Sequence, residues 1–169
     1  MSESILVTPR ELFLAIRYSD LESVRTLLAQ GADANWRNRR GDESALEYAA
    51  LMGNEEVFHL LLDHGAKDSS DYLLVEAVNG GNLEILQFLL DRVTVTAELL
   101  SGLLQEAAFD GDSKMIGFLL RQGADPKVGE SSDVNPQVIA RKNGHEEAAE
   151  ILRKASLSGT EVDTAGVLS

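Results

Sequence analysis

The 169-residue sequence contains no cysteine, only three prolines and few aromatic residues, which make up 5% of the chain. Without cysteine it can form no disulfide bond, no thiolate metal site and no catalytic thiol. The low aromatic content points away from a β-sandwich. No run of residues approaches the roughly 18 uncharged positions of a membrane span, and the first residues lack the basic and apolar regions of a signal peptide. We therefore expect a cytoplasmic protein, with the nucleus as an alternative in a eukaryotic cell.

Basic residues are also scarce, because 15 Lys and Arg stand against 28 Asp and Glu, for a formal net charge of −13. Nucleic acids and anionic membranes attract proteins through Lys and Arg, so this charge disfavours both as partners. The 44% of hydrophobic and 25% of charged residues are typical of a folded chain rather than a disordered one. The length allows one domain or one short array of repeats.

One pattern recurs along the chain. An alanine is followed by three residues, a small residue, then Asp, Asn or His, and finally an apolar segment that usually ends in paired leucines. The leading alanines are Ala15, Ala49, Ala77, Ala107 and Ala140, with steps of 34, 28, 30 and 33 residues. Gly-Ala-Asp recurs at residues 31–33 and 123–125. A period near 33 with this pattern resembles the ankyrin repeat.

Local signals in each unit indicate two short helices. Thr8, Pro9 and Glu11 form a helix start with a cap and a capping-box glutamate. Asp, Asn or His precedes each second helix, at Asp20, Asn54, Asn82, Asp112 and His145. Glycines 31, 65 and 123 stand just past the second helix, where a left-handed residue is needed. Neither helix is long enough to be stable alone, so stacking of the units must supply the core.

The resemblance implies an all-α solenoid of about five helix-turn-helix repeats with short β-hairpin-type loops. We place the repeats roughly at residues 9–40, 41–68, 69–98, 99–131 and 132–154, within a single domain over residues 1–154. Residues 155–169 are small and polar without a period, and we expect a flexible tail there. Repeat 3 ends in Asp91-Arg92-Val93 instead of Gly-Ala-Asp, so the geometry of the middle loops stays open.

The sequence offers little for catalysis. His59, His64 and His145 fall in two different repeats, and the spacing of the first two does not place them on one helical face for a metal. Acidic pairs stand at helix starts, where the helix dipole favours them. Because no nucleophile has a partnered base, we expect a protein that is not an enzyme and that has no metal or cofactor.

The resemblance implies protein binding through a concave face built from loop tips and the exposed side of each first helix. The family's variable positions fall on Arg17, Tyr18, Leu51, Met52, Asn79, Phe109, Asp110, Lys142 and Asn143. Exposed apolar residues among these would form a stripe that marks a partner site. Alternatively these side chains cover neighbouring loops, above all Leu51 and Phe109.

The first loop holds the only tryptophan and three arginines: Trp36, Arg37, Arg39 and Arg40. Trp and Arg are enriched among interface hot spots, so this finger is a second candidate contact. In the other interpretation, Trp36 packs onto the adjacent finger while the arginines neutralise Asp42, Glu43 and Glu47.

Charge is uneven along the chain. Residues 1–40 carry six basic and five acidic side chains (+1), residues 41–100 carry two and twelve (−10), and residues 101–169 carry seven and eleven (−4). An acidic middle would steer a partner with a basic surface. We therefore predict a monomeric, non-catalytic module that binds another protein, either as an adaptor or scaffold or, alternatively, as a stoichiometric inhibitor or immunity-type protein that masks the basic site of an enzyme.

Overall fold

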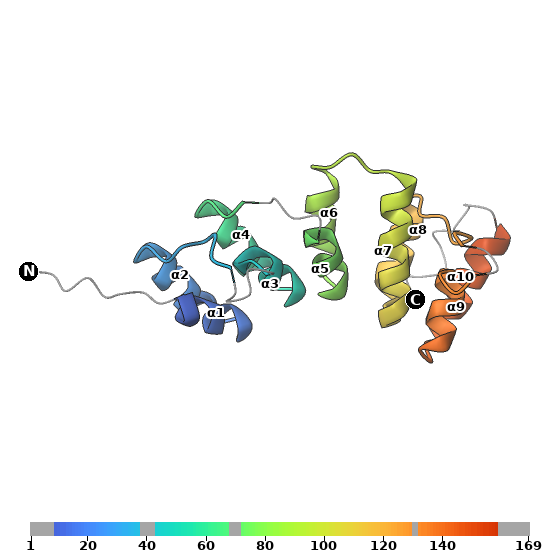
Figure 1. The fold of residues 1–169 in the computed structure, drawn as a ribbon, viewed down its shortest axis with the longest axis horizontal. Helices are drawn as coiled ribbons and strands as arrows, with labels where there is room; N and C mark the ends of the chain where they lie inside the picture. The colour runs from blue at the N-terminus through green and yellow to red at the C-terminus, as the bar shows by residue number, and fades with distance from the viewer. Residues whose placement is uncertain (1–8, 38–42, 68–71, 130–131, 159–169) are drawn as a thin grey trace, which may run out of the picture. The chain divides into compact units, whose positions relative to one another are not determined.

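The computed structural model describes residues 9–37, 43–67, 72–129 and 132–158, and these contain ten α-helices and no β-strand. The predicted all-α fold is confirmed. The chain divides into two compact units, residues 1–89 and residues 90–169, and each unit stacks its own helices (Figure 1). No helix in the described ranges is both long enough and apolar enough to cross a bilayer.

The first unit contains three successive helix pairs. They are α1 (Pro9–Arg17) with α2 (Leu21–Ala29), α3 (Ala45–Leu51) with α4 (Glu55–Asp63), and α5 (Leu73–Asn79) with α6 (Leu83–Leu90). The first helices contact one another in the order α1, α3 and α5, and α2 contacts α4. The first helices therefore form one layer, and the second helices lie behind it.

The second unit repeats this arrangement with α7 (Ala97–Asp110), α8 (Ser113–Arg121), α9 (Pro136–Lys142) and α10 (Glu146–Ser158). Helix α7 contacts α8 and α9, and α10 contacts α8 and α9. Helix α10 continues through residues 155–158, which the sequence had placed in the tail, because Ala155 is buried. The rest of the expected tail, residues 159–169, lies outside the described residues, as does Thr8.

Helix starts follow the local signals. Asp20, Asn54 and Asp112 cap α2, α4 and α8 by accepting hydrogen bonds from backbone N–H groups of the first turn. Helix α9 begins with Asn135 as its cap and Pro136 in its first turn. Helix α1 begins at Pro9 as predicted. These residues satisfy N–H groups that have no partner inside the helix.

The turn between the two helices of each pair needs a left-handed backbone. Glycine occupies this turn in four of the pairs, with φ between 63° and 82°. In the first pair the equivalent residue is Ser19, which adopts φ 53°. A side chain in this region costs free energy that glycine avoids.

Side chains also tie neighbouring repeats of the first unit together. The Asn35 amide donates to the carbonyl oxygen of Gly65 and accepts from the N–H of Lys67, both at 2.9 Å. The Asn82 amide donates to the carbonyl oxygen of Gly53 at 3.0 Å. Behind these contacts, the buried Phe58 of α4 lies edge-on to Phe88 of α6, with ring centroids 5.8 Å apart.

The irregular middle of the sequence corresponds to a change in loop length. Fifteen residues separate α2 from α3, whereas only six separate α6 from α7. Helix α7 has 14 residues against seven in α3, α5 and α9, and it begins at a Thr96 cap. By alignment of the leading alanines, residues 97–102 correspond to residues 39–44, which precede α3. Extra helical turns thus take the place of the expected finger. Among the described residues, the pairing of Arg37 with Ser44 is the one β-bridge.

Candidate protein-binding surfaces

The predicted contact positions lie where each first helix ends. Arg17, Leu51, Asn79 and Lys142 are the last residues of α1, α3, α5 and α9, and Phe109 is the next-to-last residue of α7. The Ala at the start of the repeat pattern is buried in every pair, so the residue two positions later lies on the opposite side of the helix and points outward. The residue three positions later stands at or just past the end of the helix. The sequence therefore placed these positions on the surface for a physical reason.

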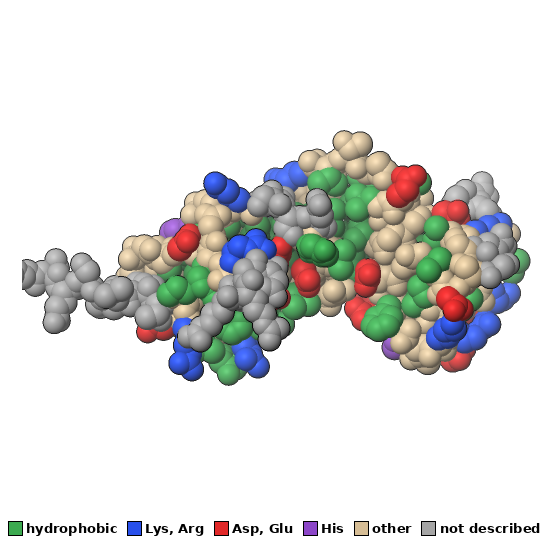
Figure 2. All heavy atoms as spheres, in the orientation of Figure 1, with side chains coloured by type: hydrophobic (Ala, Val, Ile, Leu, Met, Phe, Trp, Pro, Cys, Tyr) green, Lys and Arg blue, Asp and Glu red, His purple; other side chains and the backbone are tan. Residues whose placement is uncertain are grey.

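Exposure separates the apolar candidates. Tyr18 is 73% exposed, Phe109 56% and Met52 39%, whereas Leu51 is half-buried. The alternative of a side chain that covers a neighbouring loop thus suits the half-buried Leu51 better than the exposed Phe109. Figure 2 shows apolar side chains reaching the surface among acidic ones. The polar candidates Arg17, Asn79 and Asp110 are exposed.

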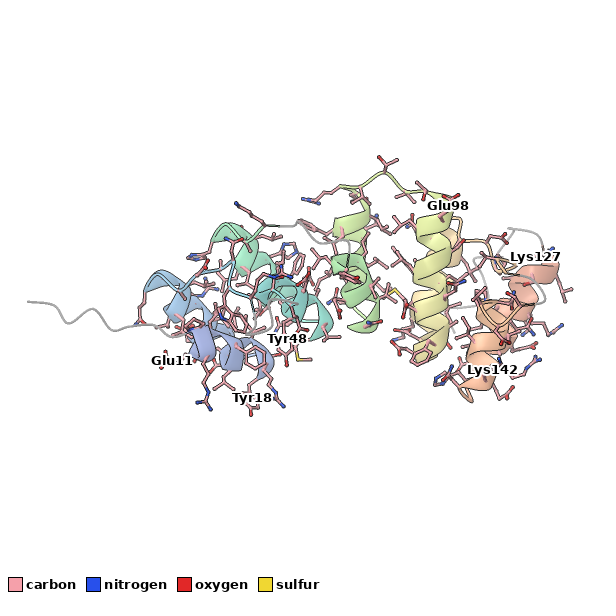
Figure 3. All side chains as sticks on the ribbon, viewed as in Figure 1. Glu11, Tyr18, Tyr48, Glu98, Lys127 and Lys142 are labelled. Carbon is pink, nitrogen blue, oxygen red and sulfur yellow. The ribbon has the colours of Figure 1, made fainter. Side chains whose placement is uncertain are left out.

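In the first unit, Tyr18 borders a groove of about 480 Å³ between α1 and α2. Figure 3 labels Tyr18 and Glu11, two of its lining residues. Leu14 and Leu27 provide its apolar walls, and Glu11, Asp20 and Glu22 also line it. The Asp20 carboxylate accepts from the hydroxyl and the N–H of Ser23, and these bonds lower its pKa. The Asp20 carboxylate therefore stays anionic at pH values at which an ordinary aspartate is protonated.

In the second unit, Phe109 lines a groove of about 340 Å³ between α7 and α9. Its other lining residues are Gln105, Glu106, Asp133, Ile139, Lys142 and Asn143. The Lys142 ammonium lies 2.7 Å from the Asp133 carboxylate, and this hydrogen bond lowers the pKa of Asp133. The Gln105 side chain donates to the carbonyl oxygen of Val134 at 2.8 Å, which ties α7 to the loop before α9.

Gln105, Glu106, Asp133 and Ile139 were absent from the sequence prediction. Gln105 and Glu106 precede Phe109 by four and three positions, so one helical turn brings them onto its face. That spacing is the signal that could have identified them. Asp110, which was predicted, does not line the groove but lies next to Phe109 and is exposed.

The finger between the first two pairs is partly structural. Trp36 is half-buried, and its ring lies 5.6 Å from that of Phe13 on α1, which in turn lies 4.8 Å from Tyr48 on α3. Trp36 therefore packs against a helix of its own repeat. Arg37 is exposed, and Arg39 and Arg40 lie outside the described residues.

Arg37 pairs with one of the carboxylates that the sequence had proposed. Its guanidinium lies 3.5 Å from Glu47, whose side chain is 3% exposed and accepts from the backbone N–H of Ser44. The Ser44 hydroxyl accepts from the N–H of Glu47 in return, which completes a capping box at the start of α3. Both Trp36 and Arg37 thus stabilise the finger, whatever else they contact.

His59 and His145 pack against neighbouring residues of the fold. His59 lies 3.9 Å from Glu55 one turn earlier on α4, and its ring lies edge-on to Phe88. The His145 ring packs so closely on Gly111 that a Cβ there would lie 2.3 Å from the ring. The described part of the chain holds no group of three or more His, Cys, Asp or Glu that could bind a metal.

Known proteins share this repeat pattern. A family model described as ankyrin repeats in three copies matches residues 12–99. The ankyrin repeat and KH domain-containing protein CBG24701 of Caenorhabditis briggsae is 35% identical over 105 residues, which cover 60% of this chain and 4% of that protein. The ankyrin repeat and KH domain-containing protein mask-1 of Caenorhabditis elegans is 28% identical over 132 residues, which cover 76% of this chain and 5% of that protein. The chain thus matches only about one twentieth of the length of these curated relatives.

Proposed function

Since the chain belongs to the ankyrin repeat family, whose repeats generally mediate protein–protein interaction, we propose that it is a non-catalytic module that binds a partner protein through the exposed ends of its first helices. The observation that carries this proposal is the exposure of Tyr18, Met52 and Phe109. All three stand at the end of a first helix, where a purely solvated surface favours polar side chains. Large apolar side chains gathered at one kind of position are typical of interfaces.

The partner that suits these surfaces has a basic face. Acidic residues outnumber basic ones along the chain, and Glu106, Asp110, Glu11 and Glu22 lie in or next to the two grooves. Opposite charges across an interface speed association and fix orientation, and salt weakens the effect for exposed groups. We propose a monomeric cytoplasmic protein whose partner is neither nucleic acid nor membrane.

The second candidate is a stoichiometric inhibitor or immunity-type protein that masks the basic site of an enzyme. Residues 41–100 favour it, because twelve acidic and two basic side chains give this stretch a net charge of −10. An adaptor would instead bind its partner without changing any activity. A titration of the partner's activity against added protein separates the two, since an inhibitor abolishes activity at a ratio of one to one.

Affinity capture tests the proposal. The immobilised protein is exposed to extract from its source cell, and bound proteins are identified by mass spectrometry at low and high salt. The test variants are Tyr18→Ala with Met52→Ala, and Phe109→Ala. Leu157→Ala is the matched control, because Leu157 is 75% exposed on α10, which is a second helix.

We expect at least one protein to be retained in a salt-sensitive way, lost with a test variant and kept with Leu157→Ala. Interface hot spots typically weaken binding by about 2 kcal/mol or more when truncated. Unchanged retention by both test variants, with unchanged circular dichroism, would refute the assigned surface. Trp36→Ala is unsuited to this test because Trp36 packs on Phe13.

A further inference from the structure

We propose that the groove between α7 and α9 binds a short segment of the partner in which an apolar side chain stands next to a lysine or arginine. This inference rests on the proposed function and names the chemistry of the partner at one site. It concerns the second unit alone, whose groove is lined by Phe109, Ile139, Glu106 and Lys142 among others.

The apolar part of the argument comes from Phe109 and Ile139. Phe109 is 56% exposed and Ile139 is half-buried, and they come from two helices that contact each other. An apolar side chain placed between them would remove both from water. The bond from Gln105 to the Val134 carbonyl holds this wall in place before any ligand arrives, which lowers the ordering cost of binding.

The charged part of the argument comes from Glu106. It is half-buried in the groove wall, and among the described residues it makes no hydrogen bond or ion pair. The other carboxylate of the groove, Asp133, is already bonded to Lys142 at 2.7 Å. A cationic side chain of the bound segment can therefore pair with Glu106. An anionic side chain has no unpaired cation in the groove, because Lys142 is already bonded to Asp133.

The chain's own C-terminal segment is a poor occupant. Residues 159–169 carry two carboxylates, Glu161 and Asp163, and no basic side chain. Both would be repelled by Glu106 and Asp110, which carry the same negative charge. The charge balance thus favours a segment from another protein, and one of basic character.

We expect two charge variants to change the affinity for the segment in opposite directions. Glu106→Gln removes the free carboxylate, so it should lower the affinity for a cationic segment by about fivefold, as for a partly exposed ion pair. Lys142→Met keeps the aliphatic stem but leaves Asp133 unpaired, so it should raise the affinity for the same segment by about twofold or more. A segment that binds through its own carboxylates would show the reverse order.

The probe is a phage-displayed library of random 12-residue peptides, selected on the full chain. A selected peptide is then synthesised, and its affinity is measured by fluorescence polarisation against the wild type and each variant. Glu147→Gln is the matched charge control, because Glu147 is an exposed carboxylate on α10 outside the groove. Leu157→Ala is the matched apolar control, because Leu157 is exposed on α10 outside the groove.

We expect enriched peptides that pair a large apolar residue with Lys or Arg. Their affinity should fall about tenfold or more with Phe109→Ala, fall with Glu106→Gln, rise with Lys142→Met and stay unchanged with both controls. Enrichment of acidic peptides, absence of enrichment, or equal effects of Glu106→Gln and Glu147→Gln would overturn the inference. If the cell extract still yields a partner that depends on Tyr18 and Met52, the proposed function stands while this inference fails.

Discussion

Replacing Gly80 with alanine should destabilise the first unit strongly. Gly80 caps the end of α5, where the backbone of α5 meets that of α3. A Cβ on Gly80 would lie 2.0 Å from the carbonyl oxygen of Ala50 and 3.0 Å from that of Leu51. Both are backbone atoms and cannot rotate away, so the helices must separate by about 1 Å before the closest contact reaches even 3.0 Å. Overpacking of this kind typically costs about 1–3 kcal/mol and occasionally more, and we expect the upper end.

Gly102→Ala is the matched control for this substitution. Gly102 is exposed in the middle of α7, and a Cβ there would have no atom within 4 Å. Alanine is a better helix former than glycine by about 1 kcal/mol, so this variant should be slightly more stable than the wild type. The same chemical change thus has opposite signs at two sites, which separates steric overlap from any general effect of alanine.

Urea unfolding followed by circular dichroism measures both effects. Because Gly80 and Gly102 belong to different units, the curves are fitted with one transition and with two. We expect Gly80→Ala to lower the free energy of unfolding by about 3 kcal/mol. A Gly80→Ala midpoint equal to that of the wild type would refute the close approach of α3 and α5.

Two substitutions and one titration test individual contacts. Ser19→Gly should raise the free energy of unfolding by up to about 1 kcal/mol, because it relieves a left-handed serine, and urea unfolding measures this. Trp36→Ala should lower it by about 2 kcal/mol, because the half-buried ring loses its contact with Phe13, and the same assay applies. Glu150 should titrate at a pH of about 2 in a carbon-13 NMR experiment, because the hydrogen bond from Arg153 lowers its pKa from 4.5.

The sign of the pH effect follows from that lowered pKa. The contribution of the Glu150 pair is complete above pH 4.5 and is lost as the pH falls toward 2, since the unfolded chain binds the proton more readily. Arg153→Met should return the titration midpoint toward 4.5. A wild-type midpoint already near 4.5 would contradict the Glu150–Arg153 pair. A Ser19→Gly variant less stable than the wild type would contradict the strain at Ser19, and a Trp36→Ala variant as stable as the wild type would contradict the contact with Phe13.

Features set by local chemistry could be predicted from the sequence. The caps at Asp20, Asn54 and Asp112 and the helix start at Pro136 depend on residues within one turn of each other. The exposure of Tyr18 followed from the repeat register, because its position relative to the buried alanine is the same in every pair.

Features set by contacts between helices could not be predicted. Helix α7 begins at the Thr96 cap, but its length depends on the burial of Leu100 and Leu103, which the repeat register did not indicate. Trp36 left two interpretations open because its contact with Phe13 spans 23 residues of sequence. Ile139 lines the groove only because α9 packs against α7, and this contact joins segments about 30 residues apart.

Site-specific photo-cross-linking tests the central proposal most directly. The photoreactive amino acid p-benzoylphenylalanine replaces Tyr18, Phe109 or Leu157 in turn, and the protein is irradiated in cell extract. If the ends of the first helices contact the partner, Tyr18 or Phe109 positions should yield a cross-linked species that Leu157 does not. Cross-links from Leu157 alone would contradict the account.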